Sequence, residues 1–202
     1  GVNAELISVN ASPMALQAMI PGEVDVIVTS VTTLVKSRLT GADVVMIASI
    51  VPTFPAHLVT PKNITDVKQL KGKTGGVGRA GTTTEIGMRL GLTRLGIDPN
   101  NDVKLVPVGA TADALAALSK GIVQFSILVE PFVREAEKLG YKSLVDISSL
   151  NIPFHWNAAL TREATTRSKA SLMTKFARAL TEAIHIFKTD KETTLKIIGK
   201  FT

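Results

Sequence analysis

Between Thr74 and Glu85 the sequence reads T-G-G-V-G-R-A-G-T-T-T-E, which places three consecutive hydroxyl residues directly after a glycine-rich turn. The residues before the turn are β-prone, and an apolar pattern with helical spacing continues from Ile86 to Leu95 before Gly96. This order predicts a strand, a turn and then a helix that begins at the hydroxyl residues.

The start of that helix could bind an anion. The first turn of a helix has backbone N–H groups without intrahelical partners, and it carries the positive end of the helix dipole. Gly81, Thr82 and Thr83 stand at this turn, and Arg79 lies just before it. We therefore predict that these four residues contact a negatively charged group. The alternative is that a glycine-rich connection between a strand and a helix is only a turn.

The same glycines also match the dinucleotide fingerprint G-x-G-x-x-G, through Gly76, Gly78 and Gly81. That fingerprint needs a well-formed apolar strand before it and an acidic residue at the end of the following strand. Lys71-Gly72-Lys73 precedes the glycines, and the next expected strand, 103–108, ends without a carboxylate. We therefore expect no nucleotide cofactor and no other cofactor.

Other polar residues follow expected strands, which is where ligands bind in open α/β sheets. Thr29 and Ser30 end one strand and open a helix together with Thr32 and Thr33, so N-capping is their alternative role. Further candidates for ligand contacts are Thr53, Phe54, Glu130, His155 and Trp156. Phe54 could instead pack under its loop, Glu130 could complement the next helix, and the aromatic residues could belong to a core.

The alternation of strand and helix patterns predicts an α/β fold with mainly parallel sheets. A helix over 169–188 is the clearest element, because apolar residues from Leu172 to Phe187 repeat on one face. Strands are expected at 4–9, 24–29, 44–49, 57–60, 74–77, 103–108, 123–129, 143–146 and 156–160. The other helices are expected at 13–20, 31–39, 66–70, 82–95, 112–119, 131–139 and 191–201.

A short internal sequence repeat, called the internal echo below, predicts two related lobes. Residues 15–24 resemble residues 114–123, which lie 99 positions later, and each segment reads as a helix closed by Gly before a strand. Polar, Pro-containing stretches at 60–63 and 148–153 are the expected crossings between the lobes. The prediction is an outer lobe formed by 1–61 and 150–202, an inserted central lobe formed by 62–149, and a hinge with a cleft between them.

Composition excludes several classes of protein. The 202 residues carry a net charge of +6, but nine Lys and Arg against four Asp and Glu within 162–202 account for most of it. These charges are spread along expected helices without aromatic residues between them, so we expect no nucleic-acid partner. The sequence contains no Cys and no motif of a metal centre or a catalytic nucleophile, so we expect neither a metal site nor an enzyme.

Five short motifs resemble the substrate-binding proteins of ABC importers, in the group that handles nitrate, sulfonates, taurine and thiamine-type pyrimidines. They cover nearly the whole chain in the order of that family. The motifs are A-L-x-A-x-x-x-G-E-V-D at 15–25, D-V-K-Q-L-K-G-K at 66–73, G-x-x-G-T-T-T at 78–84, A-L-A-A-L-x-x-G at 114–121 and V-E-P-F at 129–132.

The resemblance implies the type II periplasmic-binding-protein fold, in which two α/β lobes close over a ligand. It also implies one more strand and helix ahead of Gly1, and it places Glu130 near the cleft. We therefore expect a monomeric, periplasmic or lipid-anchored extracytoplasmic protein that delivers a small anionic or zwitterionic organic molecule to an ABC permease. The alternatives are an enzyme similar to a pyrimidine synthase of the same fold, whose iron motif requires Cys, and a ligand-sensing regulatory domain.

Overall fold

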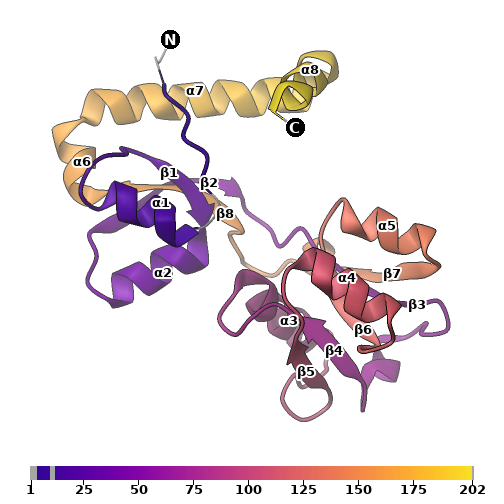
Figure 1. Ribbon diagram of the computed structural model, residues 1–202. Helices are drawn as coiled ribbons and strands as arrows, with labels where there is room; N and C mark the ends of the chain where they lie inside the picture. Colours follow the sequence, from indigo (N-terminus) through magenta and orange to yellow (C-terminus); the bar gives the residue numbers. More distant parts are fainter. Residues whose placement is uncertain (1–3, 10–11, 202) are drawn as a thin grey trace. The chain divides into compact units, whose positions relative to one another are not determined.

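The computed structural model describes residues 4–9 and 12–201 (Figure 1). The chain forms two compact units. The first consists of residues up to Thr29, of Lys36–Ala48 and of residues from Ala159 onward, and the second consists of Ser30–Val35 and Ser49–Ala158. The α/β fold class predicted from the sequence is confirmed, and the candidate ligand residues, apart from Thr29, all lie in the second unit.

A five-stranded sheet with the order β5-β4-β6-β3-β7 forms the centre of the second unit. Strand β4 is parallel to β5 and β6, whereas β3 is antiparallel to β6 and β7, so this sheet is mixed rather than mainly parallel as expected. The strands are β3 (His57–Pro61), β4 (Thr74–Val77), β5 (Lys104–Pro107), β6 (Phe125–Leu128) and β7 (Tyr141–Asp146).

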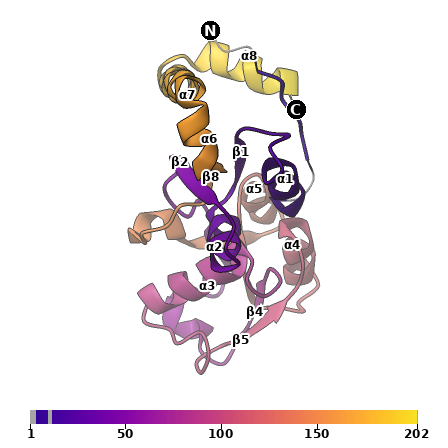
Figure 2. The ribbon, with the colours of Figure 1, turned by 90° about the vertical axis from the view of Figure 1, so that its left-hand side faces the viewer.

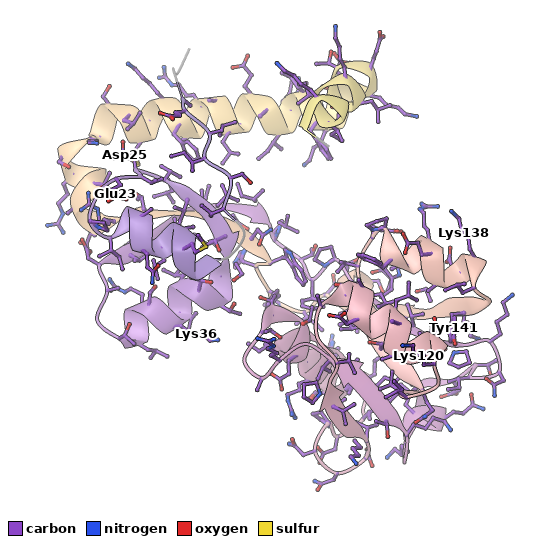
Figure 3. All side chains as sticks on the ribbon, in the orientation of Figure 1. Glu23, Asp25, Lys36, Lys120, Lys138 and Tyr141 are labelled. Atoms are coloured by element: carbon purple, nitrogen blue, oxygen red, sulfur yellow. The ribbon has the colours of Figure 1, made fainter. Side chains whose placement is uncertain are left out.

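Each face of this sheet has its own apolar core. Helix α3 (Thr83–Arg94) contributes Met88 and Leu92 to one core, together with Phe125 and Ile127 of β6. Helices α4 (Thr111–Ser119) and α5 (Phe132–Lys138) pack on the other face, where Leu128 is buried (Figures 1 and 2). The Tyr141 hydroxyl, whose residue is labelled in Figure 3, donates to the Leu118 carbonyl at 3.0 Å and so connects β7 to α4. The unit also contains two short 3₁₀ helices, η1 (Val67–Leu70) and η2 (Ile147–Leu150).

Strand β3 shows that the expected boundary at 61/62 is misplaced. This strand pairs on both sides within the five-stranded sheet, and Val59 and Thr60 are fully buried there. The polar stretch after it is a turn, in which the Ile64 N–H donates to the Pro61 carbonyl at 3.1 Å. Because β3 belongs to the five-stranded sheet, the chain enters the second unit before β3. A Pro-containing polar segment indicates a turn, but it does not indicate which sheet the preceding strand joins.

The first unit contains a three-stranded sheet with the order β1-β8-β2. Its buried residues include Met19, Val44 and Leu160, and the Asp25 carboxylate (Figure 3) accepts from Lys169 Nζ at 2.7 Å. The strands are β1 (Ile27–Ser30), β2 (Val44–Val51) and β8 (Asn157–Arg162), and the helices are α1 (Ser12–Met19), α2 (Val31–Leu39), α6 (Glu163–Ser168), α7 (Ala170–Thr189) and α8 (Lys191–Phe201). The boundary between the units crosses four of these elements, because the last residue of β1, the first five residues of α2, the last three of β2 and the first two of β8 belong to the second unit. Helix α6 was not predicted, because its first five residues, E-A-T-T-R, have no apolar periodicity.

One sequence prediction in this unit is wrong, and another is confirmed. Residues 4–9 form no strand; they are exposed and have no assigned secondary structure, because no neighbouring strand pairs with them among the described residues. The predicted long helix is present as α7, but none of its residues is buried as the structure describes them. Helical periodicity thus indicated the element but not a core that covers its apolar face. No described helix is both long and apolar enough to cross a membrane.

The internal echo corresponds to the same helix end in both units. Gly22 and Gly121 have φ values of 96° and 69°, which favour glycine at the residue after a helix cap. In α1, Gly22 N–H donates to Met19 O and Glu23 N–H donates to Ala18 O, at 3.0 and 3.1 Å. In α4, Gly121 N–H donates to Leu118 O and Ile122 N–H donates to Ala117 O, both at 3.0 Å. This is the Schellman pattern, repeated at the offset that the sequence echo predicted.

Phe54 fixes the position of helix α3 within the second unit. Its side chain is 2% exposed, and a Cβ atom at Gly87 of α3 would overlap the Phe54 ring. Only glycine therefore lets the helix approach the ring so closely. Phe154 and Trp156 hold the ring from other directions, with centroid separations of 5.2 and 4.8 Å and edge-to-face geometry.

We predict that Gly87→Ala destabilises the protein by roughly 1–3 kcal/mol, because overpacking outweighs the better helix propensity of Ala. Gly91→Ala in the same helix should cost less, since the closest contact of its Cβ would be the Cδ1 tip of Ile147, at 3.1 Å. Urea unfolding can be followed through the fluorescence of Trp156, the one Trp in the sequence. Combining Gly87→Ala with Phe54→Leu should recover part of the loss, and strict additivity of the two substitutions would contradict the contact.

Candidate functional site

Thr82 is the N-cap of α3, and its hydroxyl is committed to that role. Thr82 Oγ1 donates to the Arg79 carbonyl at 2.6 Å and accepts from the Glu85 N–H at 3.4 Å. The sequence offered Thr82 as a ligand contact, whereas these bonds show that its hydroxyl stabilises the turn. Substituting Thr82 would therefore alter the helix start as well as any ligand contact.

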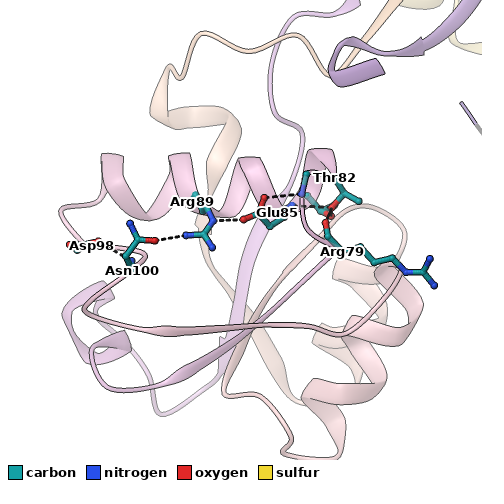
Figure 4. Close-up of polar contacts among 8 residues, drawn as sticks. Arg79, Thr82, Glu85, Arg89, Asp98 and Asn100 are labelled. Carbon is teal, nitrogen blue, oxygen red and sulfur yellow. Dashed lines mark hydrogen bonds and ion pairs between the residues drawn. The ribbon is translucent and has the colours of Figure 1, made fainter. Parts of the chain in front are cut away.

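Glu85 completes the helix start, and sequence reasoning missed it. Its carboxylate accepts from the Gly81 N–H at 3.4 Å and forms an ion pair with Arg89 Nε one helical turn later (Figure 4). The letters T-T-T-E are the S/T-x-x-E signature of a capping box, although the Glu side chain here reaches Gly81 rather than the N-cap amide. A carboxylate of the chain thus already complements the positive end of this helix.

Arg79 is not directed at the helix start. Its side chain is exposed, and Figure 4 shows the guanidinium extending away from Glu85. The donors near the start of α3 are therefore hydroxyl and backbone N–H groups. Among the described residues, the amides of Thr83 and Thr84 have no hydrogen-bond acceptor.

Gly78 lets the hydroxyl groups of Thr82 and Thr84 lie against the end of β4. A Cβ atom at this position would overlap the side-chain oxygens of both Thr84 and Thr82, and these two oxygens are 3.2 Å apart. The glycine of the fingerprint-like sequence therefore has a packing role here. It leaves space for two hydroxyls where any other residue would place a side chain.

Four hydroxyl groups form a connected cluster in the second unit. Ser30 Oγ lies 3.0 Å from both Thr32 Oγ1 and Thr33 Oγ1, and Thr32 Oγ1 lies 3.2 Å from Thr83 Oγ1. Ser30 and Thr83 were predicted site residues; Thr32 and Thr33 had been noted only as possible caps. The repeated T-S-V-T-T and T-T-T strings were the signal for both halves of the cluster. Thr29 is 7% exposed within β1, so its side chain is largely inside the first unit.

The aromatic candidates belong to a packed group whose members differ in exposure. Phe54 is buried, as described above, which supports the alternative that it packs under its loop. Trp156 is half-buried, and its backbone connects three segments: its N–H donates to Val51 O at 2.8 Å and its carbonyl accepts from Val31 N–H at 3.4 Å. Trp156 is therefore held near the start of α2, and part of its ring remains accessible.

The remaining candidates are on the surface of the second unit. His155 is exposed, and its Nδ1 lies 2.8 Å from Ser49 Oγ, a partner that sequence reasoning did not suggest. Thr53 is exposed in its loop. Glu130 is also exposed and lies 3.6 Å from Arg134, one turn into the following helix. This ion pair fits the role of a residue that complements a helix start.

The opposite end of α3 contains a separate feature, a shallow hollow lined by Thr93, Gly96, Ile97, Asp98, Pro99 and Asn100. The backbone N–H of Asn100, together with the Asn101 amide, lowers the pKa of the Asp98 carboxyl below its usual range. These groups satisfy one another within the turn, so the hollow offers little to a ligand. Within the described part of the chain, no three His, Cys, Asp or Glu residues are grouped to hold a metal ion.

A comparison with known protein families assigns the sequence to one of them. Residues 1–193 match the family described as NMT1/THI5 like. The chain belongs to the NMT1/THI5-like family. No protein with a curated description matched the chain. The resemblance to this group of binding proteins, drawn from the five motifs, is thereby confirmed at the level of the family.

Solved structures support the fold of this NMT1/THI5-like chain. The periplasmic aliphatic sulphonate binding protein SsuA of Escherichia coli superposes with a TM-score of 0.80 at 21% identity, covering 94% of this chain and 61% of its own. The alkanesulfonate-binding protein SsuA of Xanthomonas axonopodis pv. citri, bound to MOPS, gives 0.72 at 18% identity, covering 95% and 66%. The periplasmic-binding-protein fold is therefore confirmed, and the chain spans less than two thirds of either structure.

We predict that Thr82→Val lowers the free energy of unfolding by about 1 kcal/mol, because the N-cap acceptor of α3 is lost. Thr82→Ser keeps the hydroxyl and should cost much less. Thr83→Val should also have a small effect, since Thr32 is the one hydrogen-bond partner of the Thr83 hydroxyl among the described residues. Urea unfolding of the three variants measures the difference; equal losses for Thr82→Val and Thr83→Val would contradict the assigned capping role.

Proposed function

We propose that this protein is the solute-binding component of an ABC importer and binds a small anionic or zwitterionic organic molecule. The observation that carries the proposal is the combination of the Thr83 and Thr84 amides with the hydroxyl cluster of Ser30, Thr32, Thr33 and Thr83. Membership of the NMT1/THI5-like family and a fold shared with sulfonate-binding proteins support it.

The proposed oxyanion is the sulfonate or carboxylate group of such a molecule, or nitrate as an inorganic ion of the same charge. Neutral donors such as hydroxyls and helix-start amides can hold a singly charged oxyanion without a buried Lys or Arg. Trp156 is half-buried and lies near the start of α2, beside the hydroxyl cluster. In the proposed site, the accessible part of its ring would contact the organic part of the ligand, such as an alkyl chain or a flat pyrimidine-type ring. The partner would be the permease of the importer, and the protein would work outside the cytoplasm.

An enzyme is the alternative, because the family also has enzyme members. The related pyrimidine synthase considered above uses a Cys-containing iron motif, and this sequence has no Cys. Among the residues that the structure describes, no basic side chain is bonded to the hydroxyl cluster, whose contacts join one hydroxyl to another. A nucleophile normally needs such a base, so binding without chemistry fits the cluster better.

A thermal-shift screen tests the proposal directly. The protein is screened as its natural gene encodes it, with methanesulfonate, taurine, nitrate, acetate and a hydroxymethylpyrimidine, and hits are measured by calorimetry. A ligand that binds only the folded protein raises the melting temperature in proportion to its saturation. A concentration-dependent shift with methanesulfonate, taurine, nitrate or acetate supports the proposal. Flat responses to these four, each up to millimolar concentration, would sink it, even if the neutral pyrimidine gave a shift.

We expect the double variant Thr32→Val/Thr83→Val to reduce the affinity for the ligand found in that screen at least tenfold, or about 1.4 kcal/mol. The substitution keeps the side-chain shape but removes two hydroxyls, which leaves acceptors of the anion unpaired. Thr93→Val, on an exposed turn of the same helix, is the matched control and should bind normally. Calorimetry gives the affinities; an unchanged affinity in the double variant would remove the cluster from the site.

A further inference from the structure

One carboxylate lies directly beside the donors of the proposed site. The Glu85 side chain is only 14% exposed, and its oxygen contacts the Gly81 N–H, immediately before the first turn of α3. The amides of Thr83 and Thr84 belong to that same turn. A ligand headgroup at these amides would therefore be close to a fixed negative charge.

The position of this charge is fixed by a chain of contacts along α3. Arg89 pairs with Glu85 through Nε, while its Nη1 donates to Asn100 Oδ1 at 2.8 Å (Figure 4). The Asn100 N–H in turn donates to the Asp98 carboxylate at 2.8 Å. Arg89 is thus anchored at both ends, and it neutralises Glu85 from the side away from the helix start.

From this arrangement we infer that Glu85 is a specificity-determining residue, which makes the site accept a singly charged headgroup and reject a doubly charged oxyanion. The inference rests on the proposed function and specifies the ligand charge at the same site. Capping alone would need only an acceptor, which a neutral Gln also provides. A largely buried carboxylate with its own anchored cation adds a charge that capping does not require.

The physical basis is that electrostatic energy scales with the charge of the ligand. A dianion is attracted twice as strongly as a monoanion by the helix dipole and repelled twice as strongly by Glu85, but its cost of leaving water grows with the square of its charge. Because Glu85 reduces the positive potential at the helix start, the remaining attraction offsets this cost for a monoanion and not for a dianion. Removing the Glu85 charge therefore favours sulfate over methanesulfonate. Removing the Arg89 charge has the opposite effect, because the carboxylate is then no longer neutralised. The two substitutions should change selectivity in opposite directions.

The experiment measures the affinities of methanesulfonate and sulfate by competition calorimetry at low ionic strength. In the unaltered protein, methanesulfonate should bind more tightly. Glu85→Gln should raise the sulfate-to-methanesulfonate affinity ratio at least tenfold, and Arg89→Gln should lower it. Glu163→Gln is the matched control, because Glu163 also pairs with an Arg one turn later but stands at the start of α6 in the first unit; it should leave the ratio unchanged.

The outcomes separate this inference from the proposed function. If the unaltered protein binds no sulfonate, carboxylate or nitrate, the proposed function fails and the inference fails with it. If methanesulfonate binds but the ratio is unchanged in Glu85→Gln, the inference alone is overturned. Should Glu85→Gln melt below the assay temperature, Arg89→Gln decides: a lowered ratio supports the inference, and an unchanged or raised ratio refutes it.

Discussion

The close contact between Phe54 and Gly87 is the constraint on which the candidate site depends. Because residue 87 has no side chain, α3 approaches the Phe54 ring closely, and the ring is enclosed by Phe154 and Trp156. This group fixes one face of α3 and also positions Trp156. The Trp156 backbone then bonds to Val51 and Val31, which places the start of α2 near the same group. The hydroxyl cluster is therefore supported by an aromatic group whose central ring, Phe54, is buried.

Local signals in the sequence predicted the elements well. Helices α2 and α8 have the expected bounds, and the glycines after α1 and α4 mark helix ends with matching hydrogen bonds. These features depend on a few adjacent residues, so a single sequence contains the necessary information. Strand pairing is different. The β-prone residues 4–9 have no partner strand within the described part of the chain, and β3 joins a sheet that the turn after it did not indicate. Pairing depends on distant segments, which periodicity cannot identify.

The candidate site was predicted in its residue types but not in its roles. Consecutive Thr residues correctly indicated a helix start, yet the sequence could not distinguish Thr82, which caps α3, from Thr83, whose hydroxyl contacts Thr32. Arg79 was expected to face an anion because it lies just before the start of the helix in the sequence. Its side chain instead extends to solvent (Figure 4). Side-chain direction in a glycine turn depends on backbone angles that residue spacing does not determine. Glu85 was overlooked because an acidic residue in a first helical turn is ordinary.

For the proposed binding protein, the partial neutralisation of the helix start has a physical consequence. An importer needs a binding protein that captures its solute and also releases it, so very tight binding would be unsuitable. A buried Arg or Lys would hold an anion strongly through a charge-assisted bond. Hydroxyls and amides bind more weakly, and the Glu85 carboxylate further reduces the positive potential at the start of α3. In the proposed site, the Glu85 carboxylate would thus limit both the charge and the affinity of the ligand, while shape and the aromatic group would select its organic part.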